Sequence, residues 1–362
     1  MSTGEQEKLA LLTAQSRHDI CIPGECMQVL DSRACITYNP RAYGCSRMLK
    51  VLLHGNCSYD CAYCSVRTCR ERISFAPKEL AGIFLDLYRT GMADGLFLSS
   101  GIPEDAEGAM ADIVETARIL RAKGYNDYIH VKILPGAERS DIAEAARYAN
   151  RISLNAESTG AGRLRAISGI KDYEQDIKKR MDWIAQEAPG RHTTQLVVGA
   201  AGETDKEIFS CMTDLYDTVH PARVYYSAFQ PLPGTRFAEK AGTPPWRAHR
   251  WYQVDTLFRE YGFLKAELAP LVEDGTLLNA DPKALLARDL DPLDPATATC
   301  EELLRVPGIG PVTARAIVNA RERHPIRRPQ DLGIPAAYLK RAMPYLAFAH
   351  GGIRQATLAG FL

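Results

Sequence analysis

The stretch Cys57-Ser-Tyr-Asp-Cys61-Ala-Tyr-Cys64 places three thiols within one short segment, separated by three and then by two positions. Thiols at this spacing can turn inward from one loop onto a single inorganic core, as iron–sulfur ligation requires. Three ligands leave one iron of a four-iron cluster open to a substrate or cofactor. The spacing differs from both ferredoxin patterns, which disfavours a simple electron carrier. A zinc loop is the alternative, but zinc requires a fourth ligand at matching spacing.

The composition indicates a globular protein with metal or redox chemistry. The chain has 362 residues, 46% hydrophobic and 24% charged, enough for one large α/β domain and a smaller one. The first residues lack the profile of a signal peptide, and no apolar run approaches the ~18 residues of a membrane span. We therefore expect a cytoplasmic protein without a membrane segment. In that compartment, ten cysteines favour metal or redox chemistry over disulfides.

From residue 49 onward, apolar strand patterns alternate with helix patterns. The predicted strands are 49–54, 95–99, 128–134, 152–155, 194–199 and 224–230. The predicted helices are 77–90, 106–123, 141–150, 172–187, 205–219 and 245–261. Ser140 is expected to cap the third helix, and Thr204 with Glu207 forms a capping box for the fifth. Six βα units predict an α/β fold, a partial (β/α)6 barrel with a parallel sheet and right-handed crossovers.

The loops that follow the strands of such a barrel converge on one face, where the chemistry takes place. The three-cysteine loop follows the first predicted strand. Ser99-Ser100-Gly101 ends the second strand, Asn155 and Glu157 end the fourth, and Gly199 ends the fifth. The sequence therefore predicts an active site on this face.

The C-x3-C-x2-C spacing, with an aromatic residue before the last cysteine, resembles the radical S-adenosylmethionine (SAM) superfamily over roughly residues 50–235. The resemblance implies that Cys57, Cys61 and Cys64 hold a 4Fe–4S cluster and that SAM binds the open iron. It also implies that one electron, from a donor such as a flavodoxin or ferredoxin, cleaves SAM to a 5′-deoxyadenosyl radical.

The same resemblance implies a set of SAM-contacting residues. These are Tyr63, Val198 and Gly199 near the adenine, Ser99, Ser100 and Gly101 near the methionine amine, and Ser153, Asn155 and Glu157 near the ribose or carboxylate. The usual glycines and terminal glutamate of the strand-two motif are missing here. Lys132 is a further candidate, for the SAM carboxylate or the substrate, because a buried lysine is costly unless it is paired. The alternative for Ser99, Ser100 and Glu157 is a structural role at strand ends or in loops.

Four further cysteines, Cys21, Cys26, Cys35 and Cys45, lie in a segment whose Pro, Gly and Asn content predicts irregular structure. They are candidate ligands of a second, auxiliary iron–sulfur cluster, with Cys69 as another candidate fourth ligand. The alternative is free thiols. Cys211 and Cys300 are expected to be packing residues.

The end of the chain is basic, with nine Lys and Arg against four Asp and Glu from residue 300 onward. Thr299 and Glu302 form a capping box, and the following LLRVPGIGPVTARAIVNAR resembles a helix-hairpin-helix motif. In this motif Gly308, Ile309 and Gly310 bring the backbone close to a phosphate, and Pro311 begins the second helix. Thr313 and Arg315 of that helix are further candidate nucleic-acid-binding residues, and Arg315 would add salt-dependent affinity. We expect this region to bind nucleic acid. A protein-docking or purely structural hairpin is the alternative.

The expected organisation is a cysteine-rich extension (1–48), the barrel (49–265), a linker (266–298) and a small all-α helix-hairpin-helix domain (299–362). With the segments YDCAYC, LFLSSGI, YIHVKILPG, VVGAAGETD and ELLRVPGIG, the chain resembles a bacterial family of DNA modification or repair radical SAM proteins. This implies an enzyme that modifies or repairs nucleic acid, with DNA favoured over RNA. The alternatives are an RNA-modifying or sulfur-inserting enzyme with a second cluster, and a non-catalytic nucleic-acid-binding redox sensor. The sequence singles out no residue that acts on the substrate.

Overall fold

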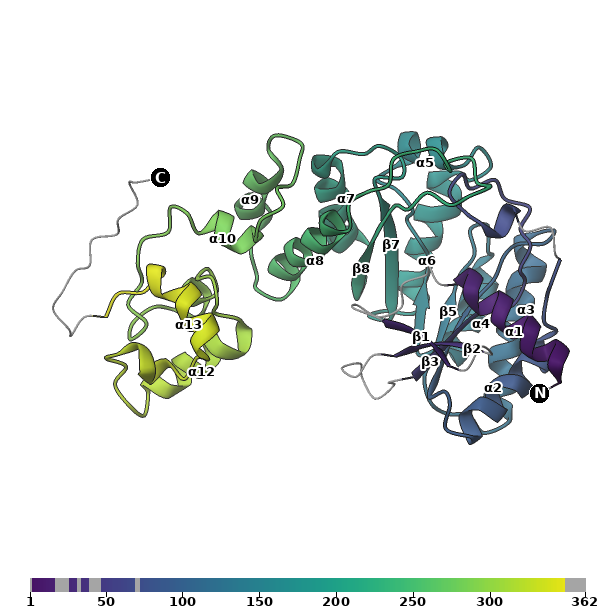
Figure 1. Cartoon of the computed structure of the whole chain (residues 1–362), viewed down its shortest axis with the longest axis horizontal. Helices are drawn as coiled ribbons and strands as arrows, with labels where there is room; N and C mark the ends of the chain where they lie inside the picture. Colours follow the sequence, from purple (N-terminus) through teal and green to yellow (C-terminus); the bar gives the residue numbers. More distant parts are fainter. Residues whose placement is uncertain (1, 17–25, 31–33, 39–46, 69–71, 349–362) are drawn as a thin grey trace. The chain divides into compact units, whose positions relative to one another are not determined.

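The computed structural model of the chain describes residues 2–16, 26–30, 34–38, 47–68 and 72–348, without the side chains of 26–30 and 34–38. The chain divides into two compact units, Met1–Ala248 and His249–Leu362. Figure 1 shows both units, and each is described here by itself. Within the described ranges, no helix is both long and apolar enough to cross a membrane.

The first unit is built on one eight-stranded sheet whose strands follow the chain order (Figure 1). Six of them are parallel and form the curled half-barrel that the sequence predicts. They are β3 (Arg47–Leu52), β4 (Gly95–Ser99), β5 (Ile129–Lys132), β6 (Arg151–Ser153), β7 (His192–Val198) and β8 (Arg223–Ala228). Every residue of β4 and of β7 is buried, as is usual in a parallel sheet that is covered by helices.

Two further strands correct the prediction of an irregular extension. β1 (Cys26–Leu30) and β2 (Ala34–Tyr38) form an antiparallel hairpin, and β2 pairs with the edge of β3. The β-branched residues Val29, Ile36 and Thr37 favour strand structure in these two short runs. The rest of residues 17–46 lies outside the described residues.

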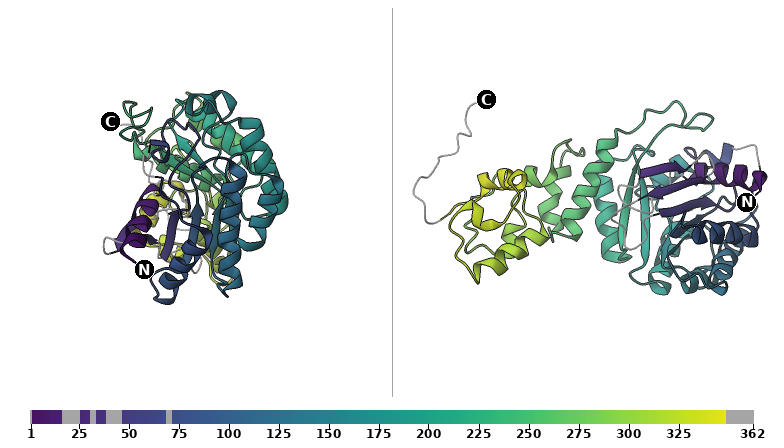
Figure 2. Two further views of the ribbon diagram at one scale, coloured as in Figure 1. Left: turned by 90° about the vertical axis from the view of Figure 1, so that its right-hand side faces the viewer. Right: turned by 60° about the horizontal axis from the view of Figure 1, so that its bottom comes forward.

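Most helices of this unit follow one another along the outer face of the curved sheet, as Figure 2 shows, whereas α1 lies apart from them and packs against β2 and β3. The helices of the unit are α1 (Thr3–Gln15), η2 (Val66–Thr68), α2 (Pro77–Arg89), α3 (Ala106–Ala122), α4 (Arg139–Tyr148), α5 (Ala161–Ile167), η3 (Tyr173–Lys178), α6 (Lys179–Glu187) and α7 (Asp205–Thr218). In α2, Leu80, Phe84 and Leu87 are buried at helical spacing, which fixes the face that packs inward.

Three details of the helices differ from the predictions. α4 starts one residue earlier than its expected cap, so that Glu138 precedes it and Ser140 lies in its first turn. α5 is not predicted by the sequence pattern. The predicted helix 172–187 is a π-helix, η3, followed by α6.

The second unit is all-helical. Its elements are the rest of α8 (Pro245–Arg259), then α9 (Lys265–Leu268), η4 (Ala269–Val272), α10 (Pro282–Leu286), α11 (Cys300–Leu303), α12 (Pro311–Arg321), η5 (Pro329–Leu332), α13 (Ala336–Ala342) and η6 (Met343–Tyr345). The predicted linker, 266–298, therefore contains short helices. The two compact units meet between Ala248 and His249. This division does not test the domain boundaries predicted from the sequence, which stay predictions.

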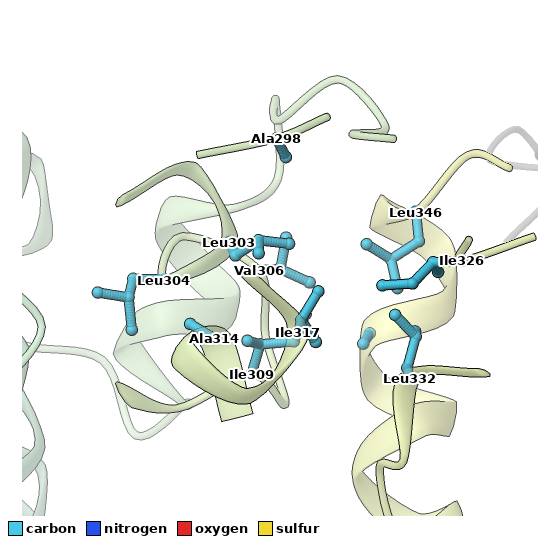
Figure 3. Packing of buried hydrophobic residues seen from close by; sticks show 11 residues of the cluster. Ala298, Leu303, Leu304, Val306, Ile309, Ala314, Ile317, Ile326, Leu332 and Leu346 are labelled. Carbon is cyan, nitrogen blue, oxygen red and sulfur yellow. The ribbon is translucent and has the colours of Figure 1, made fainter. Parts of the chain in front are cut away.

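A small hydrophobic core holds the hairpin helices of this unit together. Figure 3 shows Leu303, Val306 and Ile309 beside Ile317 of α12, with Leu346 and its neighbours facing them. The predicted capping box starts α11, because Thr299 Oγ1 accepts from the Glu302 N–H at 3.1 Å and the Glu302 carboxylate accepts from the Thr299 N–H.

Candidate active site

The loop that carries the three cysteines is anchored to the end of α5. The Asp60 carboxylate accepts a hydrogen bond from the Ser168 hydroxyl and another from the Gly169 N–H at 2.9 Å. The Ala62 N–H donates to the Ile167 carbonyl at 2.8 Å. Burial opposes ionisation of Asp60, but these hydrogen bonds outweigh it and lower the pKa of its carboxyl. The loop is thus held in place before any metal binds.

Cys57, Cys61 and Cys64 all line one cavity at the carboxyl ends of the parallel strands. Each of the six strands contributes a lining residue, from the strand itself or just after it: Leu52, Ser99, Lys132, Asn155, Val197 and Ser227. This confirms that the loop residues converge on one face of the barrel, as expected for the fold.

The number of thiols in the loop fits an iron–sulfur cluster with one open iron better than a structural zinc ion. A structural zinc site takes four protein ligands, and the loop supplies three cysteines. An iron–sulfur cluster instead takes each cysteine on a different iron. Three thiols that line one cavity match that requirement.

Burial keeps the thiols of Cys61 and Cys64 protonated while no metal is bound. It raises the pKa of Cys64 to about 12 and also raises that of Cys61. Iron ligation requires the thiolate form, so cluster binding must release protons. The buried Oε1 atom of Gln15, which also lines the cavity, has no hydrogen-bond partner among the described residues.

Glu157 lies at the centre of a buried polar network beside the cysteine loop. Its Oε1 atom accepts from Lys171 Nζ at 3.0 Å, and its Oε2 atom accepts from the Tyr63 hydroxyl. The side chains of Lys171 and Glu157 are only 5% and 7% exposed. Burial alone would raise the pKa of Glu157, but the charges of Lys171 and Lys132 and the two hydrogen bonds lower it.

Lys171 links this network to the cysteine loop. Burial alone would lower its pKa, but Cys61 and Glu157 raise it, and its ammonium hydrogen-bonds the sulfur of Cys61. No pattern in the sequence identifies Lys171, which lies 14 positions from Glu157 in the loop after α5. Glu157 has a φ of 64°, a conformation that non-glycine residues rarely adopt. Strain of this kind is common at functional sites.

The residues that end β4 line the same cavity, but their hydrogen bonds are structural. Ser100 Oγ accepts from the His54 N–H at 3.2 Å and donates to the Gly101 carbonyl. Ser99 is buried and lines the cavity. A Cβ atom on Gly101 would lie 2.2 Å from the carbonyl oxygen of Asn56. Gly101 therefore allows the cysteine loop to pack directly against the end of β4.

We expect Gly101→Ala to displace the cysteine loop. The contact with Asn56 is with rigid backbone, so the substitution should destabilise the protein by about 1–3 kcal/mol, as overpacking usually does. Urea denaturation and iron content after reconstitution measure the two effects. Gly82→Ala is the matched control: it lies in α2 with nothing within 4 Å of its Cβ position, and should stabilise by about 0.5–1 kcal/mol. Equal stability of Gly101→Ala and the wild type would contradict this role.

The remaining predicted residues divide between the cavity and its surroundings. Lys132 and Asn155 line the cavity, as does Gln195, which the sequence analysis did not identify. Ser153 is not among the lining residues, and its hydroxyl hydrogen-bonds the buried His130 at 2.9 Å.

Val198 and Gly199 are not among the lining residues, whereas Val197 is. Strand alternation explains this, since Val197 and Gln195 share a face of β7 that Val198 does not. Gly199 has a φ of 88°, and a Cβ atom there would lie 1.9 Å from Thr243 Oγ1, so its role in this structure is in packing.

The candidate ligands of a second cluster are only partly described. Cys21, Cys45 and Cys69 lie outside the described residues. Cys26 and Cys35 lie on β1 and β2, where they pair in register with Tyr38 and Val29. Their side chains are not described, and the auxiliary cluster stays a prediction.

The helix-hairpin-helix residues surround the start of α12. Gly308 has a φ of 89°, and a Cβ atom there would lie 2.4 Å from the Tyr338 carbonyl oxygen. Gly310 is the N-cap of α12, Ile309 is buried between the glycines, and Thr313 lies in the first turn. Arg315 is exposed on α12.

Comparison with protein families agrees with this geometry. Residues 51–215 match the model of the Radical SAM superfamily, and residues 296–320 match the Helix-hairpin-helix motif. The chain carries a radical SAM domain. Its helix-hairpin-helix motif lies near the carboxyl end, as the sequence predicts. The match of the domain supports the prediction that the protein is an enzyme.

Individual relatives are distant. A mitochondrial lipoyl synthase of Clavispora lusitaniae (strain ATCC 42720) is 23% identical over 172 residues, which cover 46% of this chain and 42% of that protein. The chain thus spans less than half the length of this curated relative.

Two solved structures resemble the radical SAM domain. The FeFe-hydrogenase maturase of Carboxydothermus hydrogenoformans has 13% identity and a TM-score of 0.46, over 54% of this chain and 47% of that one. Methylornithine synthase has 14% identity and a TM-score of 0.46, over 71% and 68%.

Proposed function

We propose that the protein is a radical SAM enzyme that modifies or repairs nucleic acid, with DNA favoured. The observation that carries the proposal is the C-x3-C-x2-C loop, whose three thiols line one cavity at the active face of a radical SAM domain. A 4Fe–4S cluster with SAM bound supplies one-electron cleavage to a 5′-deoxyadenosyl radical. A flavodoxin or ferredoxin is the proposed electron donor, and the cytoplasm the proposed compartment.

The residues of the cavity have separate roles in this proposal. Cys57, Cys61 and Cys64 hold the cluster and leave one iron open. Asp60 fixes the loop, and the ammonium of Lys132 and the amide of Gln195 provide charge and hydrogen bonds for a zwitterionic cofactor.

The cavity wall also has apolar members. Val197, Phe229 and Leu134 would exclude water from the cavity when the cluster and SAM are bound.

The helix-hairpin-helix motif supports a nucleic acid as the substrate. Its second helix offers first-turn N–H groups and a positive end to a phosphate. Contacts of this kind bind the backbone without reading its sequence. A base within a duplex would have to be flipped out, or be single-stranded, to reach the barrel cavity.

Anaerobic reconstitution and a SAM-cleavage assay test the proposal. We expect four irons per cluster site by chemical analysis. Upon reduction, an EPR signal that changes with SAM should appear. 5′-Deoxyadenosine should form, and its rate should rise with added single-stranded or duplex DNA. Zinc in place of iron, or no 5′-deoxyadenosine from iron-loaded protein, would contradict the proposal. Stimulation by RNA alone would favour the RNA-modifying alternative.

A further inference from the structure

Lys171 places a buried positive charge against one of the three cysteines of the loop. Its side chain is 5% exposed and lines the same cavity as the thiols. The ammonium donates to Glu157 Oε1 at 3.0 Å and hydrogen-bonds the sulfur of Cys61. A lysine is costly to bury, even beside a carboxylate. Its position against a metal-binding sulfur therefore indicates a role in the chemistry of the cavity.

Backbone contacts hold both members of the Glu157–Lys171 pair in place. The Lys171 N–H donates to Ser168 Oγ at 3.2 Å, and the same hydroxyl donates to Asp60 in the cysteine loop. Glu157 makes two backbone hydrogen bonds to β7, of 3.0 and 2.9 Å. The lysine is thus anchored to the cysteine loop, and the carboxylate is anchored to the sheet.

The ammonium acts on Cys61 more strongly than the carboxylate does. Burial raises the pKa of the Cys61 thiol, the charge of Lys171 lowers it, and the smaller effect of Glu157 raises it. The Glu157 carboxylate accepts hydrogen bonds from Lys171 and from the Tyr63 hydroxyl instead. The pair therefore presents a net positive charge to the sulfur.

Lys171 keeps its proton in this position. Burial opposes its charge, but Cys61 and Glu157 outweigh burial and raise the pKa of the ammonium above its ordinary value. A fixed positive charge beside a ligand sulfur has a definite effect on a redox centre. Reduction adds one electron to an iron–sulfur cluster, and hydrogen bonds to its sulfurs help to set the potential at which this happens. A nearby ammonium stabilises the more negative, reduced form.

We propose that Lys171 acts through Cys61 to raise the reduction potential of the cluster, and that Glu157 positions the ammonium for this role. The inference rests on the proposed function, because it requires a cluster on the three cysteines. The electron comes from the proposed donor, a flavodoxin or ferredoxin, and enters the cluster. No proton moves, since Lys171 is charged before and after reduction.

The test is the midpoint potential of the reconstituted cluster in the full chain, measured by redox titration with EPR detection in the absence of SAM. We expect Lys171→Met to make the cluster about tenfold harder to reduce, which is a potential lower by about 60 mV for a one-electron couple. Glu157→Gln removes a negative charge and should shift the potential in the opposite direction. A purely structural role of the pair would not give shifts of opposite sign.

Two further variants keep the test valid if a single substitution prevents folding. Glu157→Gln combined with Lys171→Met leaves no uncompensated buried charge, and its potential should lie between those of the single variants. Lys171→Arg keeps the charge and the hydrogen-bond donors and should retain the wild-type potential. Arg147→Met is the matched control, because it removes the exposed arginine of an ion pair on α4 and should also leave the potential unchanged.

The outcomes separate this inference from the proposed function. Equal potentials in the wild type, Lys171→Met and Glu157→Gln, or shifts of the same sign in both variants, would overturn the inference and leave SAM cleavage intact. An unchanged potential with weakened SAM binding in Lys171→Met would assign the ammonium to the cofactor and also overturn it. A wild-type protein that forms no four-iron cluster would overturn the proposed function and the inference together.

Discussion

Alanine in place of any one of Cys57, Cys61 and Cys64 should reduce 5′-deoxyadenosine formation to background. Two cysteines cannot hold three corners of a four-iron cluster, and a cluster with two open irons is easily lost. Each substitution removes a thiol from the same cavity wall, so the three variants should behave alike. The measurements are iron content, the EPR signal that changes with SAM, and 5′-deoxyadenosine after reduction.

Cys300→Ser is the matched control for these variants. Cys300 opens α11 in the second unit and is partly buried against its hydrophobic core, far in sequence from the cysteine loop. It should keep the iron content and 5′-deoxyadenosine formation of the wild type. Full SAM cleavage in any of the three loop variants would show that another residue completes the cluster, and the coordination argument would then be wrong.

Most of the barrel follows from local patterns in the sequence. Each predicted strand overlaps one of the six parallel strands, because apolar runs bounded by Gly, Pro and Asn leave few alternatives. The sequence pattern does not predict α5, because this helix has only seven residues and its N-cap is Gly160, which offers no side-chain oxygen to the first turn. This helix nevertheless supports the cysteine loop through Ile167 and the residues after it.

The sequence predicts only some of the residues of the candidate site. Strand order brings Lys132, Asn155 and Glu157 to one cavity, and the βα pattern predicts this. Lys171 could not be found in this way. It compensates the charge of Glu157 through a contact made by the folded chain, and it belongs to no periodic pattern or motif. Buried partners of this kind are set by tertiary packing alone.

Removal of either member of the Glu157–Lys171 pair should be strongly destabilising. Glu157→Gln leaves the Lys171 ammonium without its carboxylate, and Lys171→Met leaves the carboxylate without its cation. Loss of one partner of a buried ion pair usually costs about 3–5 kcal/mol, because the other charge remains buried and uncompensated. Urea denaturation of the anaerobic protein without metal measures this loss, and SAM binding after reconstitution measures the effect on the cavity.

The double variant, Glu157→Gln with Lys171→Met, distinguishes an ion pair from two independent packing residues. In the double variant no uncompensated charge remains buried. The double variant should therefore be destabilised by about 2–3 kcal/mol less than the sum of the two single variants. Arg147 and Glu144 provide a matched pair, with side chains 71% and 43% exposed, and the same cycle there should give a coupling below about 1 kcal/mol. Additive effects at Glu157 and Lys171 would show that the tyrosine and cysteine contacts, and not the salt bridge, hold this part of the cavity together.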